Sequence, residues 1–116
     1  MEDEKTNKAG QRPDPKTYAQ QLRLADFLRE PVICSVIQAL QLPWGSQGLD
    51  AGCGIGSHTL LLAEAVGPAG RVTGLDLCPE FLAQARKRAG RSDLSKRVSF
   101  QPGDLARLPF NDDAFD

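Results

Sequence analysis

The sequence is poor in the residues that build disulfide scaffolds, metal sites and catalytic triads. Its three cysteines, Cys34, Cys53 and Cys78, form no Cys-x-x-Cys pair, and its one histidine is His58. An odd number of scattered cysteines argues against a disulfide framework or a zinc site and indicates a reducing compartment. We therefore expect no metal site, and we assign no catalytic residue.

Strong net charge and long apolar segments are also missing. The formal net charge is −1, which gives no electrostatic basis for binding nucleic acid or a membrane surface. No apolar run approaches the roughly 20 residues that span a bilayer. Residues 1–5 are acidic and polar, unlike a secretory or mitochondrial presequence. These absences predict a soluble protein of the cytoplasm, or of the nucleus, with neither a nucleic-acid nor a membrane partner.

The residues that are present fit one small globular domain. Hydrophobic residues make up 41% of the 116-residue chain and charged residues 25%, which is ordinary for a globular protein. Residues 1–14 are expected to form a disordered arm, because they mix charges without apolar periodicity. Residues 15–47 are expected to form a helical region with a linker, and residues 48–116 have α/β character.

Two helices are predicted in residues 15–47. Asp14 and Pro15 fit an N-cap followed by a proline at the first helical position, which predicts a helix over residues 15–29. Pro31 is expected to start a second helix. Its apolar residues between Val32 and Leu40 recur at helical spacing and need a packing partner.

Residues 48–116 alternate between short apolar runs and helical patterns. Strands are predicted near residues 49–51, 72–75 and 98–101, with helices over residues 57–66 and 79–90. Such alternation predicts an α/β fold with a parallel sheet and right-handed crossovers. The basic cluster of residues 86–88 is interpreted as a solvated end of the second of these helices.

The glycine-rich run from Leu49 to Gly56 is the most informative stretch. An acid, Asp50, precedes glycines at alternate positions, where the first strand should turn into a helix with Ser57 as its N-cap. A strand, glycine loop and helix in this order are typical of a nucleotide-type cofactor site. A dinucleotide fingerprint would place its third glycine at position 57, which is Ser57. Asp50 would also repel a pyrophosphate, so a ligand with positive charge near the loop fits better.

The segment from Asp50 to Gly56 resembles the first motif of the class I S-adenosylmethionine-dependent methyltransferases. Residues 71–76 resemble the second strand of that family, ending in Asp76, and residues 98–104 resemble its third strand with Gly-Asp behind it. Residues 108–116 resemble the approach to the fourth strand and are most similar to the small-molecule branch that includes quinone-biosynthesis methyltransferases. The resemblance covers residues 49–116 and implies a Rossmann-like parallel sheet with S-adenosylmethionine as cofactor.

The resemblance also implies roles for individual residues. Asp50 and the loop glycines (Gly52, Gly54 and Gly56) would hold the methionine end of the cofactor. Asp76 would bind the ribose hydroxyls, and Asp104 would face the adenine amino group. Leu77 and Leu105 follow these two acids; from their position alone, packing on the adenine ring and packing in the core are both open. Tyr18 lies in the helical region that covers the cofactor pocket in related enzymes.

The family has seven strands in the order three-two-one-four-five-seven-six, and this sequence stops at Asp116, where the fourth strand should begin. We therefore expect a truncated isoform: the first half of a methyltransferase, strands one to three with flanking helices, preceded by two N-terminal helices. Strand one would then be an edge able to pair with another chain. The leading hypothesis is methyl transfer to a small-molecule acceptor in the full-length form. An NAD(P)-dependent oxidoreductase fragment and a non-catalytic interaction fragment are the alternatives.

Overall fold

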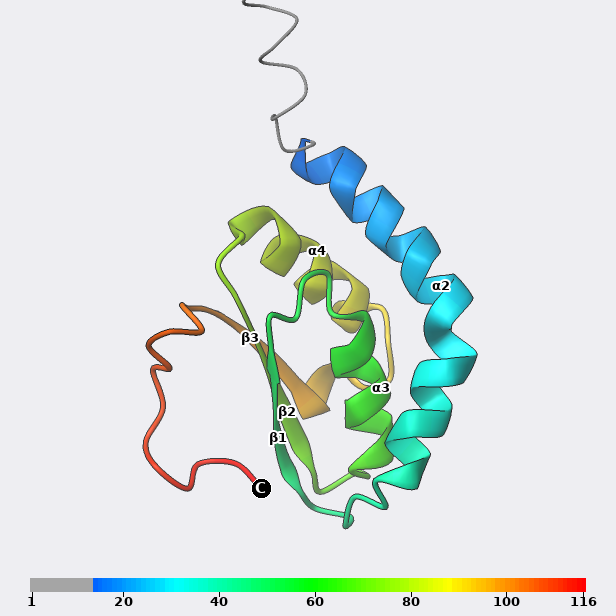
Figure 1. Ribbon diagram of the computed structural model, residues 1–116. Helices are drawn as coiled ribbons and strands as arrows, with labels where there is room; N and C mark the ends of the chain where they lie inside the picture. Colours follow the sequence, from blue (N-terminus) through cyan, green and yellow to red (C-terminus); the bar gives the residue numbers. More distant parts are fainter. Residues whose placement is uncertain (1–13) are drawn as a thin grey trace, which may run out of the picture.

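The computed structural model describes residues 14–116 and combines a three-stranded sheet with a layer of helices (Figure 1). In chain order the elements are α2 (Pro15–Ala39), β1 (Gln47–Ala51), α3 (Ser57–Ala65), β2 (Arg71–Asp76), α4 (Pro79–Gly90), the 3₁₀ helix η1 (Ser95–Arg97) and β3 (Val98–Pro102). The arm predicted for residues 1–14 lies outside the described residues, apart from Asp14.

The sheet is parallel and has the strand order β1-β2-β3, which confirms the predicted α/β class. Both crossovers run through a helix. Both step in the same direction along the sheet, so with crossovers of one hand α3 and α4 share one side of it, and residues 103–116 pass along the other (Figure 1). Because the strands are parallel, the carboxyl ends of β1 and β2 meet at one rim, next to the start of α3.

The main core lies between the sheet and its two helices. Apolar residues of α3 and α4 at helical spacing turn toward the sheet, as the sequence predicted. The fully buried side chains of this layer include Val66, Val72, Leu75 and Leu82. A cluster of Ala63, Val66 and Val72 is covered by four partly buried residues, namely Leu42, Leu62, Leu94 and Val98.

Helix α2 is continuous from Pro15 to Ala39, so the prediction of two N-terminal helices was wrong. Pro31 lies inside it. A proline removes one backbone hydrogen bond, but its fixed φ is itself helical, so a helix that is anchored before the proline at Ala19 and after it at Ile37 can pass through it. The Ser35 hydroxyl donates to the Pro31 carbonyl over 3.0 Å, and the helix curves along the molecule (Figure 1). Asp14 caps α2 as predicted, since its carboxylate accepts the N–H groups of Lys16 and Thr17.

Helix α2 buries little of its apolar surface. Only Ala19 and Ile37 are buried, whereas a row of large apolar residues is more than half exposed: Leu24, Phe27, Leu28, Val32, Val36 and Leu40. The predicted packing partner therefore covers only part of the stripe. Although α2 has 25 residues, no helix within residues 14–116 is long and apolar enough to cross a membrane.

Strand β1 forms one edge of the sheet in the described part of the chain. On its free side, the Gln47 carbonyl accepts the backbone N–H of Asp116 over 2.8 Å. The Gln47 N–H in turn donates to the Asp116 carboxylate over 2.7 Å. Residues 103–116 therefore return to the beginning of β1, where they occupy one position of that edge.

Candidate functional site

The loop between β1 and α3 is fastened to the end of β2. The N–H groups of Gly52 and Cys53 both donate to the Leu75 carbonyl, over 2.7 and 2.9 Å. The N–H of Gly54 donates to the Asp76 carboxylate over 2.9 Å. These three consecutive donors are consumed inside the fold, so they are not free to bind phosphate oxygens.

The loop glycines serve two different purposes. At Gly52 and Gly54 an added Cβ would meet nothing closer than 3.8 Å, so these positions leave open space above the loop. At Gly56 (φ +84°) a Cβ would lie 3.0 Å from both the Ala85 Cβ and the ring of Phe100. Gly56 therefore brings α3 close to α4 and β3, and its predicted contact with the methionine end of a cofactor stays a prediction. It also occupies the N-cap position of α3, so the prediction that Ser57 is the cap was wrong; Ser57 is the first helical residue.

A cavity of about 310 Å³ opens above Gly52 and Gly54. Its floor is the glycine loop with Asp76, and helix α2 forms one wall. The twelve lining residues are Tyr18, Leu22, Asp26, Arg29, Gly52, Cys53, Gly54, Ile55, Ser57, His58, Asp76 and Phe81. Two carboxylates and one guanidinium line it, so the cavity carries a net charge of −1 when His58 is neutral. We call this space the loop cavity.

Asp76 is the predicted site residue that the structure places most directly in the loop cavity. One carboxylate oxygen accepts the Gly54 N–H and the other accepts the Cys78 N–H, both over 2.9 Å. The side chain thus connects the glycine loop to the start of α4. It is half-buried, and it remains part of the cavity lining.

Asp50 does not line the loop cavity. Its carboxylate accepts the hydroxyl of the fully buried Thr59 over 2.7 Å, which fastens the end of β1 to α3. Because the side chain is used in this way, its contact with the methionine end of a cofactor stays a prediction.

The remaining predicted contacts lie at the margin of the loop cavity or outside it. Asp104 is exposed, and its carboxylate accepts the Ala106 N–H over 2.9 Å in a local turn. Leu105 comes close to the loop, since an added Cβ at Gly52 would lie 3.8 Å from it. Leu77 is 66% exposed and Leu105 55% exposed, so both are free to pack on a bound group. Their adenine contacts, and that of Asp104, stay predictions.

Cys53 belongs to the glycine loop, and its side chain is buried and unreactive. Burial raises the pKa of its thiol to about 12, and the negative charges of Asp50 and Asp76 add to the effect. The thiol is therefore protonated at neutral pH and is not a nucleophile. Its role is packing, since an added Cβ at Gly74 would lie 2.9 Å from the Cys53 sulfur.

Sequence reasoning missed most of the α2 contribution to the loop cavity. It had named Tyr18, whose ring lies 5.5 Å from that of Phe81, but not Leu22, Asp26 or Arg29. The available signal was spacing: residues 18, 22, 26 and 29 recur every three or four positions and therefore share one helix face. Only the packing of α2 shows that this face meets the loop.

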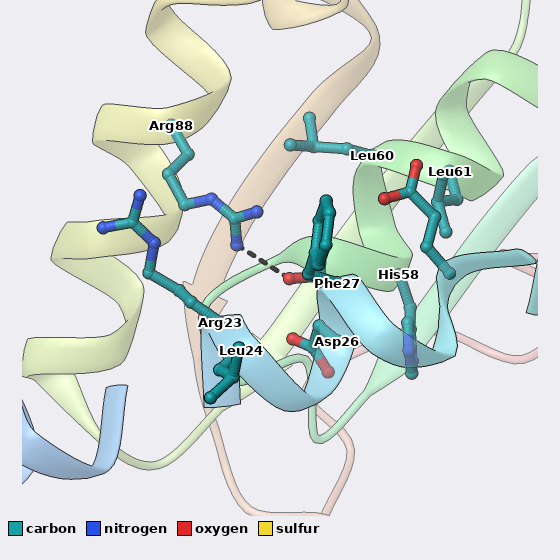
Figure 2. A pocket seen from close by; sticks show the side chains of 10 residues that line it. Arg23, Leu24, Asp26, Phe27, His58, Leu60, Leu61 and Arg88 are labelled. Carbon is teal, nitrogen blue, oxygen red and sulfur yellow. Dashed lines mark hydrogen bonds between the residues drawn. The ribbon is translucent and has the colours of Figure 1, made fainter. Parts of the chain in front are cut away.

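A second cavity of about 440 Å³ adjoins the first and shares Asp26, Ser57 and His58 with it. Figure 2 shows it between α2, α3 and α4, with Arg88 reaching in from α4. Arg88 donates to the Ser57 hydroxyl over 2.8 Å and to the Ile55 carbonyl over 3.0 Å. Burial lowers the pKa of its guanidinium, as does nearby Arg23. Arg88 is thus an inter-helix link, and its interpretation as part of a solvated helix end was wrong.

Comparison with known proteins adds independent findings. The methyltransferase domain family matches residues 49–116. A demethylmenaquinone methyltransferase from Lactobacillus johnsonii is 39% identical over 77 residues, covering 66% of this chain and 32% of that protein. An uncharacterized 37.1 kDa protein in a transposon of Streptomyces fradiae is 36% identical over 104 residues, covering 90% of this chain and 29% of its own length. The chain thus spans about a third of the length of the curated relatives it matches.

Solved structures agree with the sequence matches. A SAM-dependent methyltransferase from Aquifex aeolicus superposes with a TM-score of 0.76 at 25% identity, covering 90% of this chain and 55% of the other. The [4+2]-cyclase SpnF superposes with a TM-score of 0.62 at 33% identity, covering 72% of this chain and 30% of the other. The two solved structures share this fold, but one is named a methyltransferase and the other a cyclase.

Proposed function

Because this chain belongs to the class I S-adenosylmethionine-dependent methyltransferases, we propose that its loop cavity binds S-adenosylmethionine and serves methyl transfer to a small-molecule acceptor. The observation that carries the proposal is the loop cavity itself, which joins side-chain-free glycines to a wall and floor of net negative charge. This chain would supply the cofactor-binding half of the reaction.

The charges of the loop cavity suit this donor. S-adenosylmethionine carries an ammonium, a sulfonium and a carboxylate, which sum to +1 and complement the net −1 of the lining. Its amino-acid end has no phosphate. It therefore does not require the N–H groups of Gly52, Cys53 and Gly54, which already donate to acceptors at the end of β2. The open space above Gly52 and Gly54 admits close approach of the ligand to the backbone.

Bound in this cavity, the cofactor supplies a methyl group activated by the positive sulfonium. The chain's own contribution is to position the donor and to exclude water around it. Asp76 would hold the ribose, while the glycine loop leaves room for the methionine end. The ring pair of Tyr18 and Phe81 shields the cavity from the side of α2.

The acceptor is proposed from the relatives. Two relatives that are 39% identical, from Lactobacillus johnsonii and Staphylococcus aureus, are named demethylmenaquinone methyltransferases. We therefore assign a small-molecule acceptor to the whole protein and attach no residue of this chain to it.

The three free cysteines, Cys34, Cys53 and Cys78, support a reducing compartment such as the cytoplasm.

The oxidoreductase alternative finds no support. A nicotinamide dinucleotide carries a doubly anionic pyrophosphate, which the carboxylates Asp26 and Asp76 would repel. The donors that would bind the pyrophosphate are those already bonded to Leu75 and Asp76. The interaction-fragment alternative retains one supporting feature, the edge position of β1.

Calorimetric titration of the folded protein tests the proposal. S-adenosylhomocysteine should bind with a dissociation constant below about 100 μM, and NADH should give no binding heat at about 1 mM. Circular dichroism on the same sample would establish that the protein is folded. A folded sample that gives no heat with S-adenosylhomocysteine at about 1 mM, or that prefers NADH, would contradict the proposal.

A further inference from the structure

Helix α2 carries two opposite charges into the loop cavity. Asp26 and Arg29 are three residues apart, so they lie side by side on one helix face, and both line the cavity. Both also lie outside residues 49–116, the part that the methyltransferase domain family matches. Asp26 and Arg29 are therefore features of this chain's loop cavity that the match to the domain family does not include.

We propose that Asp26 and Arg29 together recognise the α-amino-acid end of the donor. The Asp26 carboxylate would accept hydrogen bonds from the α-ammonium, and the Arg29 guanidinium would donate to the α-carboxylate. This inference rests on the proposed function, because it needs S-adenosylmethionine in the loop cavity. It also moves the methionine end away from Asp50, to which the family resemblance had assigned it.

The carboxylates nearest the loop are committed elsewhere. Asp50 accepts the Thr59 hydroxyl and does not line the loop cavity. Each Asp76 oxygen already accepts one N–H, from Gly54 or Cys78, and its remaining lone pairs are the ones that the proposed function assigns to the ribose hydroxyls. Asp26 is thus the lining carboxylate that accepts no hydrogen bond from residues 14–116. It is half-buried, and because burial lowers the local dielectric, a hydrogen bond from an ammonium group is stronger there than in water.

Arg29 is the cation of the loop cavity. It is the one lysine or arginine among the lining residues, and within residues 14–116 no carboxylate lies within ion-pair distance of it. A carboxylate-bearing ligand in a cavity that already holds two acids requires such a counter-charge. An adjacent acid and base on one helix face form a receptor for a zwitterion, which neither residue would provide alone.

The consequence is selectivity for the amino-acid end. S-adenosylhomocysteine has the ammonium and the carboxylate, whereas 5′-methylthioadenosine keeps the adenosine and the sulfur but lacks both. The folded wild-type protein should therefore bind S-adenosylhomocysteine at least about tenfold more tightly than 5′-methylthioadenosine. Removing either charge should erase most of that preference.

Isothermal titration of Asp26→Asn and Arg29→Gln with both ligands tests the inference. Each variant should lose about tenfold or more in affinity for S-adenosylhomocysteine while its affinity for 5′-methylthioadenosine stays within about twofold of wild type. Glu30→Gln and Arg23→Gln are the matched controls. These two residues lie on the same helix and line the second cavity only, so both ligands should bind as they do to wild type.

Three results would overturn the inference. Equal losses for both ligands would indicate general damage to the cavity, and unchanged affinities would show that the two charges are not used. A selective loss in Asp50→Asn instead would return the methionine end to Asp50. If wild type binds neither ligand, the proposed function fails as well, whereas binding with unchanged selectivity refutes this inference alone. Melting temperatures of the variants at Asp26, Arg29, Glu30 and Arg23 should match wild type within a few degrees.

Discussion

The sheet with its two crossover helices and the N-terminal helix α2 differ sharply in how they are held. The first region buries a continuous layer, with Leu75 and Leu82 at 1% exposure or less. Helix α2 is twice as long as α4 but buries only Ala19 and Ile37. Its outer apolar residues, such as Leu28 and Val32, are about two-thirds exposed.

This difference separates stability from recognition. The α/β region holds the glycine loop in one shape through hydrogen bonds to Leu75 and Asp76. Helix α2 contributes little burial, yet it supplies a wall of the loop cavity and two of its three formal charges, Asp26 and Arg29. Substitutions in the buried core of the first region should therefore affect mainly folding, whereas substitutions at Asp26 and Arg29 of α2 should affect mainly ligand affinity.

A pair of leucine truncations should show the largest contrast. Leu82→Ala empties a fully buried site in α4 and should lower the free energy of unfolding by about 2–5 kcal/mol. Leu28→Ala removes the same atoms from a 69% exposed site in α2 and should change it by less than about 0.5 kcal/mol. Urea unfolding followed by circular dichroism measures both. Equal effects would mean that α2 packs far more tightly than its exposure indicates.

Two loop glycines sharpen the comparison inside the α/β region. Gly56→Ala combines a positive φ with contacts of 3.0 Å to Ala85 and Phe100, so it should cost about 2–4 kcal/mol. Gly54→Ala has a positive φ but open space, and only the backbone term of about 1–2 kcal/mol applies. Its added methyl group should instead weaken S-adenosylhomocysteine binding. The reverse order of stabilities would refute the packing role of Gly56.

The link between β1 and α3 gives a smaller effect. Asp50→Ala leaves the hydroxyl of buried Thr59 without its acceptor, which should cost about 1–3 kcal/mol of folding stability. The double variant with Thr59→Val removes both groups and should recover part of that loss, as a double-mutant cycle would reveal. Additive losses would show that the two side chains do not interact.

The smallest expected effect on folding stability comes from the Cys53 thiol, and it is absent at neutral pH. Its folded pKa of about 12 lies above the ordinary value of 9.0, so the folded protein keeps a proton that the unfolded chain loses. Its contribution to stability is therefore complete below pH 9 and declines as the pH rises toward 12. Cys53→Ala should lose less stability than wild type over that range in thermal melts. Rapid alkylation of Cys53 at pH 8 in the folded protein would contradict this assignment.

The sequence predicted the α/β region far better than α2, for physical reasons. Glycine spacing, strand periodicity and the prolines at positions 31 and 79 are local signals, and for Pro79 the local signal gave the correct start of α4. At Pro31 the same signal misled, because packing at both ends carries the helix through a missing hydrogen bond. The use of the Asp50 carboxylate by Thr59 and the approach of Asp26 to the loop depend on tertiary contacts, which local patterns do not contain.

A nuclear magnetic resonance titration with S-adenosylhomocysteine would locate the ligand on the chain. If the ligand binds in the loop cavity, the backbone amide signals of Gly52, Gly54 and Asp76 should shift together with those of Asp26 and Arg29, while signals around Val98 stay in place. Shifts confined to the outer face of α2, or to residues 103–116, would show that the ligand binds outside the loop cavity.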